Sequence, residues 1–188
     1  MRARLPWLLV VGVVGVAVVV GQALAGKKAV GQTGSGVSCG KAGLVAQTAV
    51  GGGSAYTVPP GKRQLTSWST QAGANGGQMA LVVFRPWNGG NYRVVVASDV
   101  ETLTPNALNT FKLKGGNHRW DVKYHDLIGL WCSADADGAF STGSGGDSYS
   151  FQSYASVPAA GPHTGAFVSL PPGSAGLRAN IIATVNDR

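Results

Sequence analysis

Short runs in which apolar and polar residues alternate make up much of the chain. From Leu177 to Val185 every second residue is apolar, and the residues between them are polar except for Ile182. The segment 119–125 alternates in the same way and places its Trp, Val and Tyr residues on one face. A period of two with one polar face is typical of an antiparallel strand packed on one side. Residues 79–84 are apolar throughout, which predicts a central strand buried on both faces.

Turn signals rich in Gly, Pro, Asn and Asp separate these runs. They stand at 51–54, 59–61, 73–77, 88–91, 105–106, 115–117, 135–138, 143–147 and 171–173. The runs between them are roughly 6–10 residues long, which fits strands and is too short for most helices. No segment after residue 25 shows a clear apolar period of 3.6 residues. The pattern predicts an all-β domain over residues 37–188, an antiparallel β-sandwich of jelly-roll type, in which residues 85–92 connect two strands as a hairpin.

The first 25 residues follow the layout of a secretory signal peptide. Arg2 and Arg4 precede the uncharged apolar run Leu5–Val20, and Ala23-x-Ala25 supplies the small residues of a cleavage site. We therefore expect a cleaved signal peptide over 1–25 and a secreted protein with no membrane segment after cleavage. The alternative is an uncleaved anchor, because about 20 apolar residues can span a bilayer. Residues 26–36 are rich in Gly, Lys and Ser and predict a flexible leader.

Two cysteines, Cys39 and Cys132, are the whole thiol content of the chain. In an exported protein two cysteines most often pair, so we expect a disulfide between them. It would close a loop of about 94 residues and stabilise the fold by about 4–5 kcal/mol through chain entropy. The alternative is a pair of buried, inert thiols.

The charge pattern argues against a nucleic-acid partner. Charged residues make up only 12% of the chain. Without Arg2 and Arg4, 13 basic residues face 8 acidic ones, a net charge of +5, and the basic residues are scattered. A nucleic-acid-binding protein would gather them on one face or helix. A mildly basic surface remains compatible with weak attraction to anionic wall polymers.

Three groups of residues resemble catalytic sites, and we expect none of them to be one. Gly36–Gly40 matches G-x-S-x-G, but that motif needs a strand before it and a helix after it. His118 and His125 lie near Asp121 and Asp126, yet an odd spacing puts the two imidazoles on opposite faces of a strand, and His163 is remote in sequence. Asp99 and Glu101 share one side of an extended segment, whereas glycoside hydrolysis needs two acids across a groove.

Asp135-Ala136-Asp137-Gly138 is similar to part of a calcium loop, to which Asp147 could contribute from the next loop. It lacks the third acidic ligand and the closing Glu of the EF-hand pattern. We expect an ordinary Asp-Gly turn and no metal or other cofactor, with a calcium site as the alternative.

The aromatic residues give the best candidate for a binding site. Trp68, Trp120 and Trp131 lie inside strand-like runs, which predicts core packing. By contrast, Trp87 and Tyr92 flank a turn that contains two amides. A flat ring covers the apolar face of a sugar while amides reach its hydroxyl groups, so these residues form the candidate ligand site. The alternative is that Trp87 caps the open end of the core. The four candidate residues are Trp87, Asn88, Asn91 and Tyr92.

Several blocks, taken in order, resemble secreted actinobacterial-type proteins of uncharacterised activity. The blocks are YTVPPG (56–61), LTSWSTQAG (65–73), MALVVFRP (79–86), YRVVVA (92–97), TP (104–105), LNTF (108–111) and DLIGL (126–130). The resemblance covers about residues 54–186 and implies a small, exported jelly-roll sandwich without implying an activity. Where the related pattern commonly has Gly before the Asp of its Asp-x-x-Gly turn, this chain has His125.

These observations lead to three functional hypotheses. The first is a secreted, non-catalytic module that binds carbohydrate or a cell-wall polymer. The second is a structural protein of the cell envelope, which the low charge and the disulfide favour. The third is a small secreted hydrolase that uses Asp99 and Glu101 or the cluster between His118 and Asp126.

Overall fold

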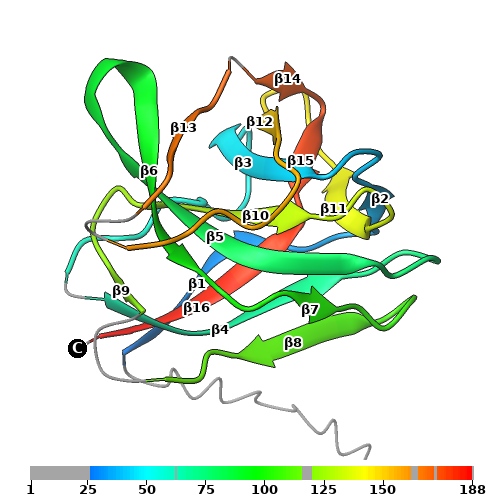
Figure 1. The fold of residues 1–188 in the computed structure, drawn as a ribbon, viewed down its shortest axis with the longest axis horizontal. Coiled ribbons are helices and arrows are strands. Elements are labelled where there is room, and N and C mark those ends of the chain that lie inside the picture. Colours follow the sequence, from blue (N-terminus) through cyan, green and yellow to red (C-terminus); the bar gives the residue numbers. More distant parts are fainter. Residues whose placement is uncertain (1–25, 62, 116–119, 162–164, 172, 188) are drawn as a thin grey trace, which may run out of the picture.

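The computed structural model describes residues 26–61, 63–115, 120–161, 165–171 and 173–187. In this part of the chain, antiparallel strands curl into two large sheets that pack face to face, with a small third sheet at one end (Figure 1). One short 3-10 turn is the only helical element of the described residues. The prediction of an all-β antiparallel sandwich is thereby confirmed. None of the described residues belongs to a helix long and apolar enough to cross a membrane.

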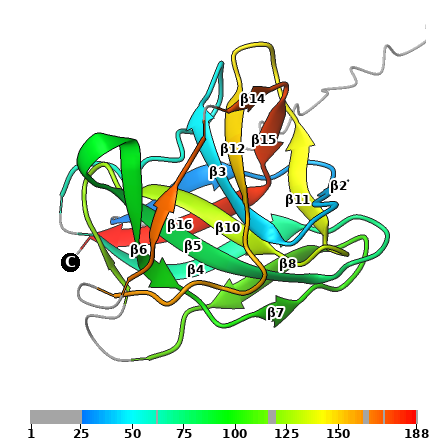
Figure 2. The same cartoon turned by 45° about the horizontal axis from the view of Figure 1, so that its top comes forward.

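The five-stranded sheet has the order β1-β16-β4-β8, with β9 beside β4. In Figure 1 it lies below β5 and β10 of the larger sheet, and Figure 2 shows the same two layers turned by 45°. Its strands are β1 (Lys27–Gln32), β4 (Arg63–Gln71), β8 (Leu108–Lys112), β9 (Asp121–Val122) and β16 (Ile181–Asp187).

The eight-stranded sheet has the order β13-β6-β5-β10-β3-β12-β14, with β7 beside β5. Its strands are β3 (Gly43–Ala49), β5 (Gln78–Pro86), β6 (Asn91–Ala97), β7 (Glu101–Thr102), β10 (Leu127–Cys132), β12 (Ser148–Ser153), β13 (Phe167–Ser169) and β14 (Ser174–Ala175). At its centre, residues 79–84 of β5 and all of β10 are buried. This confirms the prediction of a central strand that is apolar on both faces.

A small third sheet, of order β15-β11-β2, takes up the first part of the run from Leu177 to Val185, so the run is divided between two sheets. It consists of β2 (Val37–Ser38), β11 (Asp137–Thr142) and β15 (Leu177–Ala179). The run therefore forms β15 in one sheet and β16 in another, rather than the single strand that its alternation predicted. Asn180 marks the corner: its amide donates to the Gln71 carbonyl at 2.8 Å and accepts from the Gly34 amide at 3.0 Å. Asn180 is fully buried, so the prediction that it lies on a polar face exposed to solvent was wrong.

Three tryptophans belong to a core that both sheets share. The exposed fractions of Trp68, Trp120 and Trp131 are 1%, 3% and 6%, which confirms their predicted place in the packing. The Trp131 indole donates to the Tyr154 carbonyl at 2.9 Å. The predicted alternation of 119–125 is shorter than expected, because β9 has only two residues and Tyr124 is 52% exposed.

The predicted flexible leader, 26–36, contains a strand. Residues Lys27–Gln32 form β1, which pairs with β16 along its whole length, and Val30 is buried in the core. At Gly31, φ is +87°, and a Cβ atom would lie 2.2 Å from the Ile181 carbonyl oxygen. Backbone pairing and the burial of Val30 thus override the polar composition of this segment. The predicted signal peptide, 1–25, lies outside the described residues.

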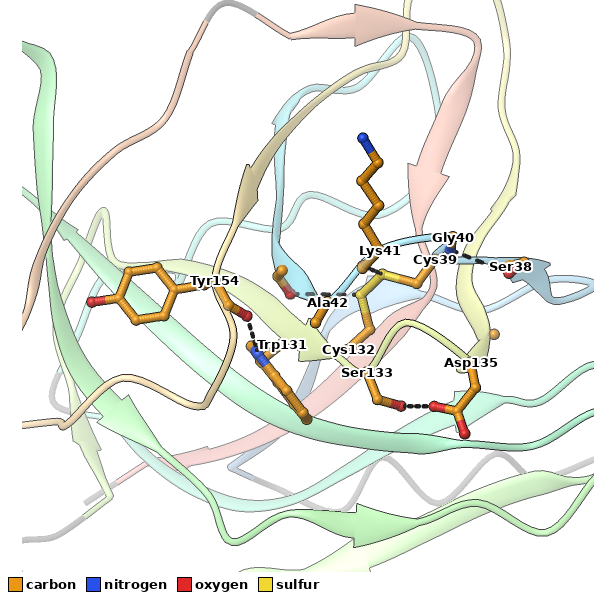
Figure 3. Close-up of a disulfide and its surroundings, with 12 residues drawn as sticks. Ser38, Cys39, Gly40, Lys41, Ala42, Trp131, Cys132, Ser133, Asp135 and Tyr154 are labelled. Carbon is orange, nitrogen blue, oxygen red and sulfur yellow. Dashed lines mark hydrogen bonds between the residues drawn. A yellow bond between two sulfur atoms is a disulfide. The ribbon is translucent and has the colours of Figure 1, made fainter.

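The predicted disulfide is present between Cys39 and Cys132, whose Cα atoms are 6.4 Å apart (Figure 3). It fastens the residue after β2 to the last residue of β10, 93 positions further along the chain. The alternative of two free thiols is therefore wrong. A disulfide fits an extracellular protein, since such bonds persist in oxidising compartments.

Candidate functional site

The predicted ligand residues lie on a hairpin formed by β5 and β6, which projects from the large sheet at the upper left of Figure 1. Its tip is the 3-10 turn Asn88–Gly90, closed by a hydrogen bond from the Trp87 amide to the Asn91 carbonyl at 2.8 Å. At Gly89 and Gly90, φ is +68° and +78°, a region that glycine adopts at little cost. The predicted hairpin connection over 85–92 is therefore confirmed.

The pleat of the hairpin separates two of the predicted residues. Tyr92 pairs with Pro86, whereas Arg93 pairs with Arg85 and also with Phe167 of β13. Directly opposite residues in an antiparallel pair point to the same side, and the next pair points to the other side. Tyr92 therefore lies on one face of the hairpin, and Arg93 and Phe167 lie on the opposite face.

On the second face, Trp87 packs against Phe167 and Arg93. The two ring centroids are 5.6 Å apart at 62°, an edge-on arrangement. The Arg93 guanidinium carbon lies over both rings, 5.7 Å from the Trp87 centroid and 5.5 Å from the Phe167 centroid. Such contacts are favourable because the ring faces carry negative charge density. We call these three residues the hairpin platform.

The hairpin platform is open to solvent. Trp87 is 50% exposed and Phe167 is 56% exposed, so the alternative in which Trp87 caps the core is wrong. Asn88 and Asn91 are exposed beside it, and the Asn91 amide reaches the Asn88 carbonyl at 3.4 Å. One part of the indole is thus held by neighbours while another part remains accessible.

On the first face, Tyr92 lines a depression of about 540 Å³, which we call the hairpin groove. Pro86 and Tyr92 form one wall of the groove. Residues 47–50, at the end of β3, and residues 55–57 form the other wall. Leu127, the first residue of β10, also lines the groove, because β10 runs between β5 and β3, and so does His125, which lies just before that strand. The volume is in the range of small-molecule sites.

Two buried polar residues of the hairpin groove serve the fold. Gln47 donates to the Ala49 carbonyl and accepts from the Ala179 amide, both at 2.7 Å. The Tyr56 hydroxyl donates to the Ala179 carbonyl at 2.5 Å. Burial raises the pKa of Tyr56 well above its usual value, so this hydroxyl keeps its proton. Both side chains thus join the groove wall to β15 through hydrogen bonds with the backbone of Ala179.

Asp126, part of the hydrolase hypothesis, is engaged in a buried ion pair. Its carboxylate accepts hydrogen bonds from Arg85 Nε at 2.8 Å, from Arg85 Nη2 at 2.7 Å and from the Lys123 backbone amide at 2.7 Å. These hydrogen bonds with Asp126 raise the pKa of Arg85, against the effect of its partial burial. The neighbouring His125 is exposed, has φ of +70° and stacks on Tyr124 with centroids 3.7 Å apart.

The other residues of the hydrolase hypothesis, and His163, do not come together with Asp126 in the part of the chain that the structure describes. Asp121 lies on β9, and His118 and His163 lie outside the described residues. Asp99 and Glu101 lie between β6 and β7 and at the start of β7, and neither lines the hairpin groove.

The G-x-S-x-G segment contains the edge strand β2. The Ser38 hydroxyl accepts from the Gly40 amide at 3.2 Å, and no helix follows, as expected for a coincidental match.

The three aspartates of the calcium alternative each have a protein partner. Asp147 is buried and accepts from Arg178 Nε at 2.6 Å, from the Gly51 amide at 3.0 Å and from the Ser144 amide. Burial works against its charged form, but these bonds outweigh it and hold the pKa of Asp147 below its usual range.

Asp135 accepts from the Ser133 hydroxyl at 2.5 Å, and Asp137 from the Asn75 amide at 3.4 Å. Across the described ranges, no three His, Cys, Asp or Glu side chains are placed to hold a metal ion.

Comparison with known proteins adds no relative. No protein-family model, no curated protein sequence and no solved structure matches the chain. The resemblance to secreted actinobacterial-type proteins therefore stays a prediction.

Sequence reasoning missed two members of the hairpin platform, Arg93 and Phe167. Arg93 reads as one polar residue in an alternating strand, and Phe167 lies 74 positions further on in a segment without clear periodicity. Only the pairing of β13 with β6 brings them together.

Proposed function

We propose that this protein is a secreted, non-catalytic module that binds carbohydrate or a cell-wall polymer through the hairpin platform. The observation that carries the proposal is the half-exposed Trp87, which neighbours hold in place at the tip of a projecting hairpin. Exposed apolar side chains that lie together, as Trp87 and Phe167 do, can mark a ligand-binding site, whereas a single one would need no explanation.

The chemistry of the platform suits a pyranose ring. The apolar face of a sugar can lie on the accessible part of the indole, while the exposed amides of Asn88 and Asn91 are within reach of its hydroxyl groups. Because Phe167 and Arg93 already restrict the indole, little side-chain entropy is lost on binding.

The charge of the platform favours an acidic polymer over a neutral one. Arg93 forms no ion pair with any residue that the structure describes, and no carboxylate belongs to the platform. Its guanidinium can therefore pair with a carboxylate or phosphate of the polymer. We expect binding to weaken as the salt concentration rises, because exposed charges are screened.

The proposal is tested by affinity electrophoresis and titration calorimetry with soluble polysaccharides, one neutral and one acidic set. Trp87→Ala is expected to abolish binding and to leave the far-ultraviolet dichroism unchanged. Leu108→Ala is the matched control, because Leu108 is 59% exposed on β8 of the other sheet. The proposal fails if the wild-type protein binds no polysaccharide, or if Trp87→Ala binds as well as Leu108→Ala.

A second comparison decides which face of the hairpin is used. Tyr92→Ala alters the hairpin groove and leaves the hairpin platform intact, since the two lie on opposite faces. We expect this variant to retain most of the binding. If Tyr92→Ala lost binding and Trp87→Ala retained it, the ligand site would be the hairpin groove and not the hairpin platform.

The other two hypotheses have less support. For a hydrolase, Asp126 is paired with Arg85, and Asp99 and Glu101 do not line the hairpin groove. For a structural envelope protein, no feature of the described residues favours self-association over ligand binding.

A further inference from the structure

A second depression lies beside the disulfide, on strands that do not contribute to the hairpin. Its volume is about 510 Å³, and we call it the disulfide pocket. Tyr149 and Phe151 of β12, Phe140 of β11 and Pro171 line it, and Cys39 and Lys41 form part of its rim. The volume falls in the range of small-molecule sites.

Aromatic rings give this pocket its character. Tyr149 and Phe151 are two positions apart on β12 and so share one face. The Phe140 and Tyr149 rings contact each other with centroids 4.6 Å apart at 58°. Phe151 lies against the backbone of Gly43, where a Cβ atom would be 2.4 Å from the ring. Glycine at position 43 thus makes room for this ring, and the pocket presents flat apolar walls.

The rim is fixed and carries a single kind of charge. The disulfide holds Cys39 to β10, and the Cys39 sulfur lies 3.0 Å from the Lys41 carbonyl oxygen. Figure 3 shows the Lys41 side chain extended away from the disulfide, with its ammonium group joined to none of the residues drawn. Lys41 forms no ion pair with any residue in the described part of the chain, and no Asp or Glu lines the pocket.

We propose that the disulfide pocket binds an aromatic carboxylate. A flat ring would lie against Tyr149 and Phe151, since aromatic rings prefer offset or edge-on contact with each other. Its carboxylate would pair with Lys41, the one charged residue of the lining. This site is independent of the hairpin platform, because the two share no residue.

The test uses 2-naphthoate as the probe, titrated by calorimetry against the folded, disulfide-bonded protein. We expect saturable binding of one molecule per chain. Lys41→Gln should weaken it about fivefold, since an exposed ion pair contributes modestly. Lys28→Gln is the matched control, because Lys28 is also an exposed lysine but lies on β1. The neutral analogue 2-naphthamide should bind the wild-type protein and Lys41→Gln equally.

A second variant tests the ring contact without removing a charge. Phe151→Leu keeps an apolar side chain at this half-buried position and should weaken both probes alike. Trp87→Ala should bind 2-naphthoate as the wild-type protein does, whatever its effect on polysaccharides.

Three outcomes would overturn the inference. The first is that the wild-type protein shows no saturable binding of 2-naphthoate. In the second, Lys41→Gln binds it as tightly as Lys28→Gln, which would show that the carboxylate is not recognised. In the third, dodecanoate binds at the same pocket more tightly than 2-naphthoate, which would assign the site to an aliphatic chain.

Discussion

Asp147 connects three segments of the fold, and its replacement by asparagine gives a sharp test of the structure. Its carboxylate accepts hydrogen bonds from Arg178 of β15, from the amide of Gly51 and from the amide of Ser144. Asparagine keeps the size of the side chain but replaces one acceptor oxygen by an NH2 group and removes the negative charge. Arg178, whose side chain is 17% exposed, would lose its ion-pair partner.

The expected cost follows from the burial of the pair. Removing one partner of a buried ion pair costs about 3–5 kcal/mol, because the other charge stays in a poorly solvated place. Partial exposure of Arg178 puts this case at the lower end, about 3 kcal/mol. For a domain of this size that corresponds to a fall in Tm of about 6–12 °C.

The pH dependence has a definite sign. The pKa of Asp147 is lowered in the folded state, whereas an Asp in the unfolded chain has its ordinary pKa of about 3.9. The stability that Asp147 contributes is therefore fully present above the unfolded pKa and is lost as pH falls through the folded pKa. The difference in Tm between the wild-type protein and Asp147→Asn should be constant near pH 6–7 and should narrow below about pH 4.

Calorimetry at a series of pH values measures both effects. Asp135→Asn is the matched control, because Asp135 is exposed and accepts from the Ser133 hydroxyl. This variant should change stability by less than about 0.5 kcal/mol. The reasoning would be refuted if Asp147→Asn were no less stable than Asp135→Asn, or if its difference from the wild-type protein stayed constant down to pH 2.

Three further variants and one control variant test other parts of the fold. The double variant Cys39→Ser, Cys132→Ser should lose about 4–5 kcal/mol of unfolding free energy, measured by urea denaturation, because a loop of about 94 residues is no longer closed. Val30→Asp should destabilise the protein by several kcal/mol, since it places a charge in the core, while Lys28→Asp at an exposed position of β1 should change the Tm little. Trp68→Ala should cost about 3–5 kcal/mol by the same urea assay. Equal stability of the Val30 and Lys28 variants would contradict the assignment of β1 to the sheet.

Most of the fold could be predicted from the sequence, because strands and turns have characteristic patterns among residues that are close together in the chain. Alternation and turn residues indicated the all-β class, the buried strand over 79–84 and the hairpin between Arg85 and Tyr92. The prediction of the disulfide followed from having only two cysteines in a chain whose first 25 residues predict export. Each of these predictions depends on residues close together or on a single available pairing.

The errors arose where distant segments decide the structure. Nothing in the composition of 26–36 indicates that β1 finds a partner in β16, at the other end of the chain. In the same way, Asn180 is polar in sequence but buried at a corner, because the carbonyl of Gln71 and the amide of Gly34 meet it there. At the candidate site, Trp87 was found, whereas its neighbour Phe167 depends on long-range pairing.

The placement of β16 has a consequence for how the chain reaches its native state during biosynthesis. Residues 181–187 are synthesised after all the other described strands, yet they lie between β1 and β4, and each of those strands needs β16 as its hydrogen-bonded neighbour. The two halves of this sheet therefore stay unpaired in the nascent polypeptide until residues 181–187 have been synthesised. A product terminated before Ile181 would have a divided sheet rather than a shortened one, with an unsatisfied edge on either side of the gap.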